Sequence, residues 1–436
     1  MATIRLDLNK PIKKMKPMHG GGQPPIGGSD LSAHMHYLTE AGIPFSRLHD
    51  VGGAFGSNRY VDVPNLFRDF DADETDPANY DFTFTDQLLK VLTEAGVEPY
   101  YRLGTTIENL SLIKSYHTAP PKDPAKWARI CEHIIRHYTE GWADGFRYNI
   151  RYWEIWNEPE VQNQMMWSGT PEEYYHLYDV TATHLKACFP HLKIGGYASC
   201  GFYAAVPAVG LLPGTNIPGT IPPSEHENKL LDFFFGIFRY IKEHGSPIDF
   251  FSWHTYADTA RAAKMDAWLH EQLQQLGYGH LETHLNEWDP YAVEFGTAHH
   301  SAEVAAMMLA MQHGHADICC IYDMRTTTAP FCPLFDIRTD KPIHAYYALV
   351  AFNALYRLGM QVETVCDTDG LYAAAASDGA HHALLVSNLT GSDQPLAMEG
   401  AELSGARYHI IDQERLLSWA PHANVIPNNA VLLIEW

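Results

Sequence analysis

The feature that most constrains the fold is a repeated alternation of apolar runs and helical patterns from about residue 16 to residue 358. Eight of the runs have the length and apolar character of buried parallel strands. They cover residues 16–20, 45–50, 97–104, 151–157, 193–199, 249–256, 280–287 and 316–324. Helical stretches lie between them, at residues 86–95, 127–140, 171–188, 229–244, 260–276 and 301–313. Eight strands in βα alternation predict an α/β fold of the (β/α)8 TIM-barrel type rather than an open sheet.

The sequence pattern changes after residue 356. Short β-like runs, separated by Gly, Asp, Asn and Ser, cover residues 362–365, 371–376, 383–388, 407–411 and 431–436. This pattern is typical of a small antiparallel β-sandwich module, to which the alternating residues 3–8 are expected to add a strand. We therefore predict a catalytic barrel at residues 16–356 and a β-sandwich module made of residues 1–15 and 357–436.

A doubly wound nucleotide-binding fold is the structural alternative for such a chain. It requires a Gly-x-Gly-x-x-Gly turn after an early strand. The glycines at residues 20–22 and 27–28 do not have this spacing. We interpret them as a loop over the mouth of the barrel.

The net charge and the cysteine content limit the classes of partner that we expect and indicate a cellular compartment. The net charge of −22 argues against nucleic acid and anionic membranes as partners, because both favour Lys and Arg. Residues 1–10 lack the apolar core of a signal peptide, and no stretch approaches the roughly 20 apolar residues of a membrane helix. The seven cysteines include no C-x-x-C pair and are expected to be free thiols. These features predict a cytoplasmic protein and are compatible with a homo-oligomer.

Polar residues end most of the predicted strands. Active sites of this fold lie at the carboxyl ends of the strands. The residues found there are Arg47, His49, Asp50, Arg102, Asn157, Glu158, His254, Tyr256, Glu287, Asp323 and Arg325. So many titratable groups at the ends of apolar segments predict an active site.

Two of these residues, Glu158 and Glu287, are carboxylates in matching surroundings. Each ends an apolar and aromatic run, directly after an Asn and with Trp and Pro close by. Cleavage of a glycosidic bond requires such a pair, because one carboxyl protonates the leaving oxygen while the other attacks or supports the anomeric carbon. The pair therefore predicts a glycosidase.

Glu158 is the expected general acid. Trp153 and Trp156 would make its surroundings apolar, and burial raises the pKa of a carboxyl toward the neutral range. Asn157 beside it is expected to bond the sugar 2-hydroxyl, an interaction that strengthens in the transition state.

Glu287 is the expected nucleophile and must stay ionised. Tyr256 and Arg47 are the expected donors to it, and Trp288 is expected to offer a sugar-stacking face. His254 and Tyr256 lie two apart on one strand, so both are expected in the lumen. Asp289 is the alternative nucleophile.

Three segments carry a resemblance to a known family. The Trp153-x-x-Trp156-Asn157-Glu158-Pro159 segment, the His254-Thr255-Tyr256 segment and the Asn286-Glu287-Trp288 segment resemble the clan of retaining (β/α)8 glycosidases. Within it the pattern is most similar to glycoside hydrolase family 39, known for β-xylosidases and α-L-iduronidases. The stretch that begins at Trp167 is similar to the helix entry of that family, and the resemblance spans residues 16–345.

The resemblance implies a role for each matching residue. Glu158 would be the acid/base and Glu287 the nucleophile. The residues expected to bind substrate are Asn157, His254, Tyr256, His49, Arg47, Trp288 and Trp167. The third strand ends in Tyr101-Arg102-Leu103-Gly104 and the eighth in Tyr322-Asp323-Met324-Arg325, which departs from the endings expected of xylosidases. Both departures touch the sugar pocket, so the sugar stays open.

Three competing interpretations remain. A metal-dependent hydrolase would need a His-x-His at the end of the first strand, but His34-x-His36 falls in the following helical stretch, and we expect neither a metal nor a cofactor. A non-catalytic carbohydrate-binding protein would retain the aromatic residues and lose one carboxylate. An endo-acting enzyme would have a cleft open at both ends, whereas loops at residues 20–28 and 210–223 are expected to block one end.

The sequence thus predicts a retaining exo-β-glycosidase that hydrolyses oligosaccharides by double displacement. A β-xylosidase is the first expectation, with galactosidase, arabinosidase or iduronidase as alternatives. Retention requires the two carboxyls to lie about 5–5.5 Å apart, whereas inversion requires roughly 6.5–9.5 Å.

Overall fold

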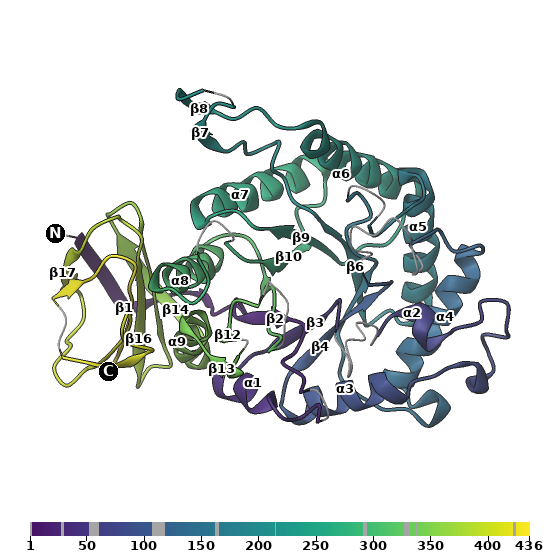
Figure 1. Cartoon of the computed structure of the whole chain (residues 1–436), viewed down its shortest axis with the longest axis horizontal. Coiled ribbons are helices and arrows are strands. Elements are labelled where there is room, and N and C mark those ends of the chain that lie inside the picture. Colours follow the sequence, from purple (N-terminus) through teal and green to yellow (C-terminus); the bar gives the residue numbers. More distant parts are fainter. Residues whose placement is uncertain are drawn as a thin grey trace.

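The computed structural model describes residues 2–27, 30–51, 61–106, 118–161, 165–213, 215–290, 294–326, 332–336, 338–421 and 424–436. A closed barrel of parallel strands forms one part, and a nine-stranded sheet lies beside it (Figure 1). Both described ends of the chain lie in that sheet. The (β/α)8 prediction is confirmed.

The barrel strands follow one another around the ring in sequence order. They are β2 (Gly20–Gly22), β3 (Phe45–Leu48), β4 (Glu98–Leu103), β5 (Tyr152–Ile155), β6 (Lys193–Ser199), β9 (Phe250–Thr255), β10 (Glu282–Trp288) and β11 (Ile318–Ile321). The helices outside them are α1 (Met35–Ala41), α3 (Thr83–Glu94), α4 (Pro124–Thr139), α5 (Pro171–Cys188), α6 (Glu225–His244), α7 (Thr259–Leu276), α8 (Ala298–His313) and α9 (His344–Leu358). Shorter helical turns are α2 (Val63–Leu66), η2 (Pro77–Asn79) and η3 (Trp142–Asp144).

Local sequence signals set where the long helices begin and end. Capping boxes open α5 and α6: the Thr170 hydroxyl accepts from the Glu173 backbone N–H, and Ser224 does the same with Glu227. Gly245 and Gly277 end α6 and α7 in the left-handed conformation, at φ of 69° and 89°. Among the described helices, none combines the length and apolar character needed to cross a bilayer.

The first barrel strand differs from the prediction. It is formed by Gly20–Gly22, which we had interpreted as a loop, and residues 16–19 precede it. A Cβ at Gly20 would lie 2.8 Å from the Cys319 carbonyl oxygen, and one at Gly21 would lie 2.2 Å from the Met324 sulfur. At Gly20 and Gly21 neighbouring atoms leave no room for side chains, and a run of three glycines carries no apolar pattern to detect. Gly28, the end of the predicted loop, lies outside the described residues.

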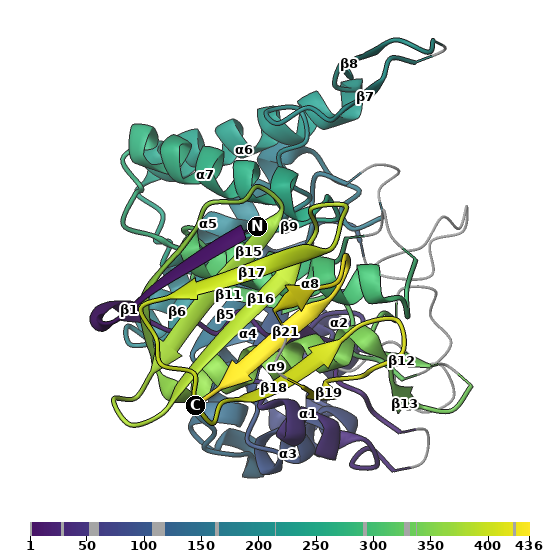
Figure 2. The same cartoon turned by 90° about the vertical axis from the view of Figure 1, so that its left-hand side faces the viewer.

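The other predicted blocking loop also differs. It contains a hairpin of β7 (Val209–Leu211) and β8 (Pro218–Thr220), which projects beyond the ring of helices (Figures 1 and 2). Val209 is 80% exposed at its base. A second small hairpin joins β12 (Phe335–Asp336) and β13 (Lys341–Pro342).

The predicted β-sandwich module is one hydrogen-bonded sheet, which faces the viewer in Figure 2. Its strands are β1 (Ala2–Lys14), β14 (Met360–Cys366), β15 (Leu371–Ser377), β16 (His382–Asn388), β17 (Gln394–Glu399), β18 (Arg407–Ile411), β19 (Ser418–Ala420), β20 (Val425–Ile426) and β21 (Val431–Glu435). All pairs in it are antiparallel except β1 with β17, which is parallel.

The two faces of this sheet belong to different cores. On β16, Ala383 and Leu385 join the core of the barrel and its helices, whereas Leu384 and Val386 join a second core. This period of two is the side-chain alternation of a strand. The second core also contains Ile4 from the N-terminal strand, so both ends of the chain close the same module. All seven cysteines are free thiols.

Substitution of the β2 glycines tests the steric origin of this strand. We expect Gly20→Ala to lower the free energy of unfolding by about 1–3 kcal/mol, because the added methyl meets a backbone carbonyl that cannot rotate away. Gly22→Ala is the matched control, since its Cβ would meet its nearest atom at 3.6 Å, an ordinary contact. Urea denaturation followed by tryptophan fluorescence measures both; equal losses would contradict the steric explanation.

Candidate active site

Side chains fill the barrel lumen in layers. An apolar cluster toward the amino ends of the strands contains Phe45, Tyr100, Tyr152, Phe250, Ile318 and Cys320. Residues two positions further along a strand point to the same side, one layer nearer the carboxyl end. Arg47 follows Phe45 in this way, and Glu154 follows Tyr152. The lumen therefore changes from apolar to ionic as the strands approach their carboxyl ends.

Arg47 is the centre of the ionic layer. Its Nε donates to Glu154 Oε2 at 2.9 Å, its Nη1 to Glu287 Oε2 at 3.0 Å and its Nη2 to Asn157 Oδ1. The Asn286 amide donates to the other Glu154 oxygen at 2.6 Å. Arg47 is 1% exposed and Glu154 is fully buried. One guanidinium thus links strands β3, β5 and β10.

A bulge in β10 brings two consecutive residues to the lumen. Leu285 pairs with Trp253 of β9, and Glu287 pairs with His254, so two residues of β10 face one of its neighbour. Regular alternation would send Asn286 and Glu287 to opposite faces, and a bulge removes this constraint. Asn286 consequently bonds Glu154 while Glu287 bonds Arg47.

Left-handed backbone after β5 also brings two consecutive side chains to the lumen. Trp156 has φ of 70° and Glu158 has φ of 42°, values that ordinary side chains rarely adopt. The Glu158 N–H is held by the carbonyl oxygens of Tyr197 and Ala198, each at 3.2 Å. The turn lets both Asn157 and Glu158 reach the lumen just beyond the strand.

Burial dominates the electrostatics of Glu158. It raises the pKa of this carboxyl to about 7, while the positive charge of Arg47 opposes the rise. A hydrogen bond of 2.6 Å joins Glu158 Oε1 to His254 Nδ1. Burial also lowers the pKa of His254 to about 4, so its imidazole is neutral at pH 7. Glu158 therefore has the surroundings of a carboxyl that holds a proton near neutral pH.

Glu287 has more donors around it. Tyr256 donates its hydroxyl proton to Oε1, and Arg47 donates to Oε2. Burial raises the pKa of Glu287, and the charge of Glu158 adds to the rise, whereas Arg47 and the Tyr256 hydrogen bond limit it. The two carboxyls thus have different surroundings: Glu287 binds a cation and a phenol, and Glu158 binds a neutral imidazole.

The two carboxyls lie close together. Single oxygen atoms of Glu158 and Glu287 and a ring nitrogen of His254 all lie within 4.8 Å of one another. The His254 Nδ1 lies 3.8 Å from Glu287 Oε2. Seven sequence-predicted residues are therefore in or beside one cluster: Arg47, His49, Asn157, Glu158, His254, Tyr256 and Glu287.

Asn157 and His49 contribute uncharged polar groups to the cluster. The Asn157 Nδ2 is buried and has no hydrogen-bond partner among the described residues. His49 is 2% exposed. Burial, followed by the charges of Arg102 and Arg47, keeps the pKa of His49 well below its ordinary value. Asn157 thus offers an unused donor, and His49 a neutral ring.

The two tryptophans expected to bind sugar differ from the prediction. Trp288 is fully buried and offers no face to a ligand, because the bulge before it turns the Glu287 side chain toward the lumen. Trp167 is 3% exposed, donates to the Thr170 carbonyl at 2.9 Å, and packs edge-on against Trp156. Both indoles belong to the hydrophobic core that surrounds the carboxylate segments.

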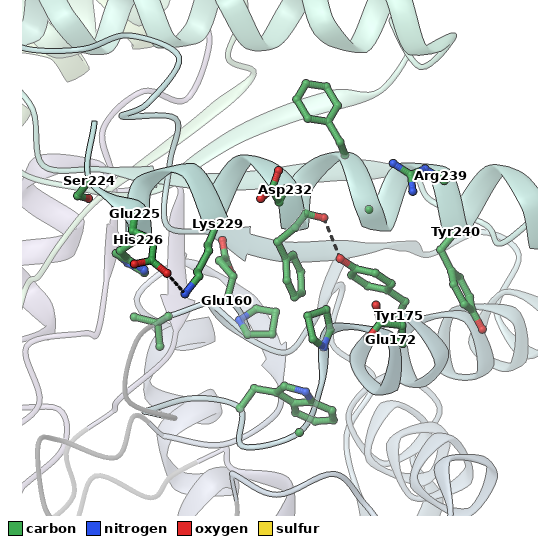
Figure 3. A pocket seen from close by; sticks show the side chains of 18 of the residues that line it. Glu160, Glu172, Tyr175, Ser224, Glu225, His226, Lys229, Asp232, Arg239 and Tyr240 are labelled. Atoms are coloured by element: carbon green, nitrogen blue, oxygen red, sulfur yellow. Dashed lines mark hydrogen bonds and ion pairs between the residues drawn. The ribbon is translucent and has the colours of Figure 1, made fainter. Parts of the chain in front are cut away.

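A cavity of about 1540 Å³ lies between α5 and α6, beside the segment that follows Glu158 (Figure 3). Pro159, Glu160 and Val161 line one side of it, and Trp167 lies in its wall. Burial raises the pKa of Glu160 to about 8. Glu158 itself is not among the residues that line this cavity.

Other polar residues near the strand ends form separate pairs. Arg102 bonds Asp62, Arg325 bonds Asp323, and His300 bonds Asp289 at 2.8 Å. Asp289, the alternative nucleophile, is fully buried and held by that histidine. It does not belong to the Glu158–Glu287 pair.

Glu154 was not identified from the sequence. It lies in the centre of an apolar strand, four residues before Glu158, with no exposed surface. Such a charge requires a buried partner, so its position within Tyr-Trp-Glu-Ile-Trp was the signal that could have found it.

Two groups among the described residues have the spacing of metal ligands. One is the Glu158, His254 and Glu287 cluster, and the other is Glu132, His184 and Cys188. His34 and His36, weighed from the sequence, lie at the start of α1 and belong to neither group.

Comparison with known proteins decides the family. The model of glycosyl hydrolases family 39 matches residues 60–357. The chain belongs to this family. The resemblance inferred from the carboxylate segments is confirmed.

Relatives and solved structures agree with this membership. The chain is 24% identical over 334 residues to a β-xylosidase of Geobacillus stearothermophilus, covering 69% of this chain and 58% of that protein. It is 28% identical over 186 residues to a β-xylosidase of Caldicellulosiruptor saccharolyticus, covering 41% of this chain and 31% of that protein. The matches thus span less than two thirds of both relatives.

The structural neighbours share the fold over the whole length. A glucosidase from Croceicoccus marinus superposes with a TM-score of 0.77 at 20% identity, covering 100% of this chain and 98% of that one. A monomeric β-xylosidase from Caulobacter crescentus superposes with a TM-score of 0.68 at 16% identity, covering 100% and 99%.

Removal of the central guanidinium tests how strongly the ionic layer supports the fold. We expect Arg47→Met to lower the free energy of unfolding by about 3–5 kcal/mol, because it leaves Glu154 buried without a counter-charge. The double variant Arg47→Met/Glu154→Gln should recover part of this loss. Arg5→Met is the control: its partner Glu399 is exposed, and we expect a change below about 1 kcal/mol. Urea denaturation measures these three variants and Glu154→Gln alone; additive effects of the two buried substitutions would contradict the coupling.

Proposed function

We propose that this protein is a retaining exo-β-glycosidase that acts on oligosaccharides, with a β-xyloside as its first substrate. The observation that supports this is the Glu158–Glu287 pair, whose oxygens approach within 4.8 Å at the carboxyl end of the barrel. Their different surroundings suit different roles: a carboxyl with a pKa of about 7 serves as the acid, and one bound by Arg47 and Tyr256 serves as the nucleophile.

The first step forms a covalent glycosyl-enzyme. A Glu287 oxygen attacks the anomeric carbon, the bond to the leaving oxygen breaks, and Glu158 gives that oxygen its proton. Arg47 and Tyr256 hold the Glu287 oxygens in place before the attack. The leaving alcohol departs neutral.

The second step releases the sugar. Glu158, now ionised, takes a proton from water while the water oxygen attacks the anomeric carbon and the ester bond to Glu287 breaks. We propose that Asn157 bonds the sugar 2-hydroxyl; its buried amide nitrogen, which has no partner among the described residues, supports this role. The neutral His254 is hydrogen-bonded to Glu158 Oε1 and orients that carboxyl.

The spacing favours retention over inversion. An inverting pair must leave room for a water molecule and is roughly 6.5–9.5 Å apart, whereas a retaining pair is about 5–5.5 Å apart. Single oxygens of the two carboxyls lie within 4.8 Å of each other, as the shorter separation requires.

The proposed sugar and exo mode come from relatives, since the two relatives described above are named β-xylosidases. The departures at Arg102 and at Asp323-Met324-Arg325 keep other sugars as outcomes of the test. The hairpin expected to close the cleft points outward, so cleavage mode is also tested directly.

The pH dependence of kcat/KM tests the acid. We expect activity to fall as pH rises above about 7, because Glu158 must be protonated in the first step and its raised pKa lies there. Glu158→Gln should remove this alkaline limb on an aryl glycoside whose leaving group needs no proton. An alkaline limb that persists in that variant would assign it to another group.

Activity on a panel of p-nitrophenyl glycosides tests the function itself. The panel contains β-xyloside, β-galactoside, β-glucoside, α-L-arabinoside and α-L-iduronide. We expect release from β-xyloside that is abolished by Glu287→Ala, and a kcat reduced about 10²–10⁴-fold by Glu158→Ala, because this variant lacks the base of the second step. Glu282→Gln is the matched control, because it lies at the opposite end of the same strand.

Two further readouts complete this test. The first product observed by NMR should be the β-anomer, and xylo-oligosaccharides should release xylose alone. An α-anomer would overturn retention, and internal cleavage would show an endo-acting enzyme. No turnover by a folded protein that still binds oligosaccharide would show a carbohydrate-binding protein.

A further inference from the structure

We infer that Glu132, His184 and Cys188 form a binding site for a divalent transition-metal ion such as Zn²⁺, on the outer surface of the barrel between α4 and α5. This site is separate from the carboxylate pair and does not depend on the proposed function. No catalytic step is assigned to it.

The helices bring three different ligand types together. His184 and Cys188 are four residues apart in the last turns of α5, so they share one face of that helix. Glu132 faces them from the middle of α4. The His184 Nε2 lies 2.6 Å from Glu132 Oε2 and 3.8 Å from Cys188 Sγ, and single ligand atoms of all three lie within 4.8 Å of one another.

These distances approach those of a tetrahedral centre. Zinc binds nitrogen and oxygen at about 2.0–2.2 Å and sulfur at about 2.3 Å, which separates ligand atoms by roughly 3.3–3.7 Å. The nitrogen–sulfur distance of 3.8 Å lies just above this range. The carboxylate oxygen, 2.6 Å from His184 Nε2, must move away from that nitrogen by about 0.7 Å, exchanging its hydrogen bond with His184 for a bond to the metal.

The surroundings favour a cation. The three residues are half-buried, so an ion from solution can reach them. Cys188 is the last residue of α5, and the carboxyl end of a helix carries partial negative charge. Nitrogen, sulfur and oxygen ligands together suit zinc better than the oxygen-only sites of magnesium or calcium.

Arg136 is the neighbouring cation, and its guanidinium also lies beside the Cys188 thiol. It donates to Glu132 Oε1 at 2.8 Å and also bonds Glu140, which offsets its charge. Its guanidinium lies 5.0 Å from the centre of the Phe189 ring. Arg136 therefore occupies the far oxygen of Glu132 and directs Oε2 toward His184, as an outer partner of a metal ligand does.

Binding of the metal ion would make the stability of the folded protein depend on the ion and on pH. The Cys188 thiol must lose its proton, so each ion bound releases one proton and binding weakens as pH falls. The ion would link α4 to α5, the helices that follow β4 and β5. Because the ion binds the folded chain, it should raise the melting temperature.

Titration of the chelator-treated full-length protein with Co²⁺ and then Zn²⁺ tests the inference. We expect one Co²⁺ per chain, with the visible bands of a tetrahedral site and a thiolate charge-transfer band that Zn²⁺ abolishes. Cys188→Ser should remove the charge-transfer band, and both Cys188→Ser and His184→Asn should weaken Zn²⁺ binding at least about 10-fold.

Matched variants separate this site from others. Cys366→Ser changes another half-buried thiol and should leave binding unchanged. Zn²⁺ should raise the melting temperature of the unsubstituted protein and not of Cys188→Ser, while hydrolysis of the preferred glycoside is the same in both. Absence of binding would overturn the inference, as would binding that both substitutions leave intact. In either case these residues form only an ion pair.

Discussion

The buried guanidinium of Arg47 is the interaction on which the rest of the site depends. A charge in a low-dielectric interior is stable only with partners of opposite charge and satisfied hydrogen bonds. Arg47 meets this requirement through Glu154, Glu287 and Asn157, from two other strands of the barrel. The position of Glu287 is consequently coupled to β3 and β5, far from it in the sequence.

Local irregularities of the backbone give the site its density of polar groups. A regular strand delivers every second side chain to the lumen. The bulge at Asn286–Glu287 and the left-handed residues around Asn157 each deliver two consecutive side chains. Such irregularities cost stability and persist where the surroundings hold them in place. Here carbonyl groups of β6 and the ionic layer hold them.

The nine-stranded sheet supports the barrel on the side of the nucleophile strand. One of its faces completes the core that covers α8 and α9, and Ser387 of β16 donates to the Ala302 carbonyl of α8 at 2.7 Å. The helix α8 follows β10, which carries Glu287. The sheet thus completes the packing of the barrel where β10 and β11 return to β2.

The sequence by itself determined the fold class, the family and the two carboxylates, because these are encoded in local patterns. Apolar runs, helical periodicity and polar strand ends need no knowledge of neighbours to be recognised. Seven of the eight predicted barrel strands cover nearly all of the observed strand, whereas the first, residues 16–20, reaches only Gly20 of β2. The exception, β2, has glycines where atoms of β11 and Met324 leave no space, and no local pattern records such a contact.

Only the tertiary structure decided which residues share the site. It joined Glu154 to Arg47, placed Asn286 and Glu287 on the same side, and buried Trp288 and Trp167 behind them. It also brought Glu132 to His184 and Cys188. The physical reason is that these relations depend on contacts between distant segments and on bulges, whereas sequence periodicity reports only the average direction of a side chain along its own element.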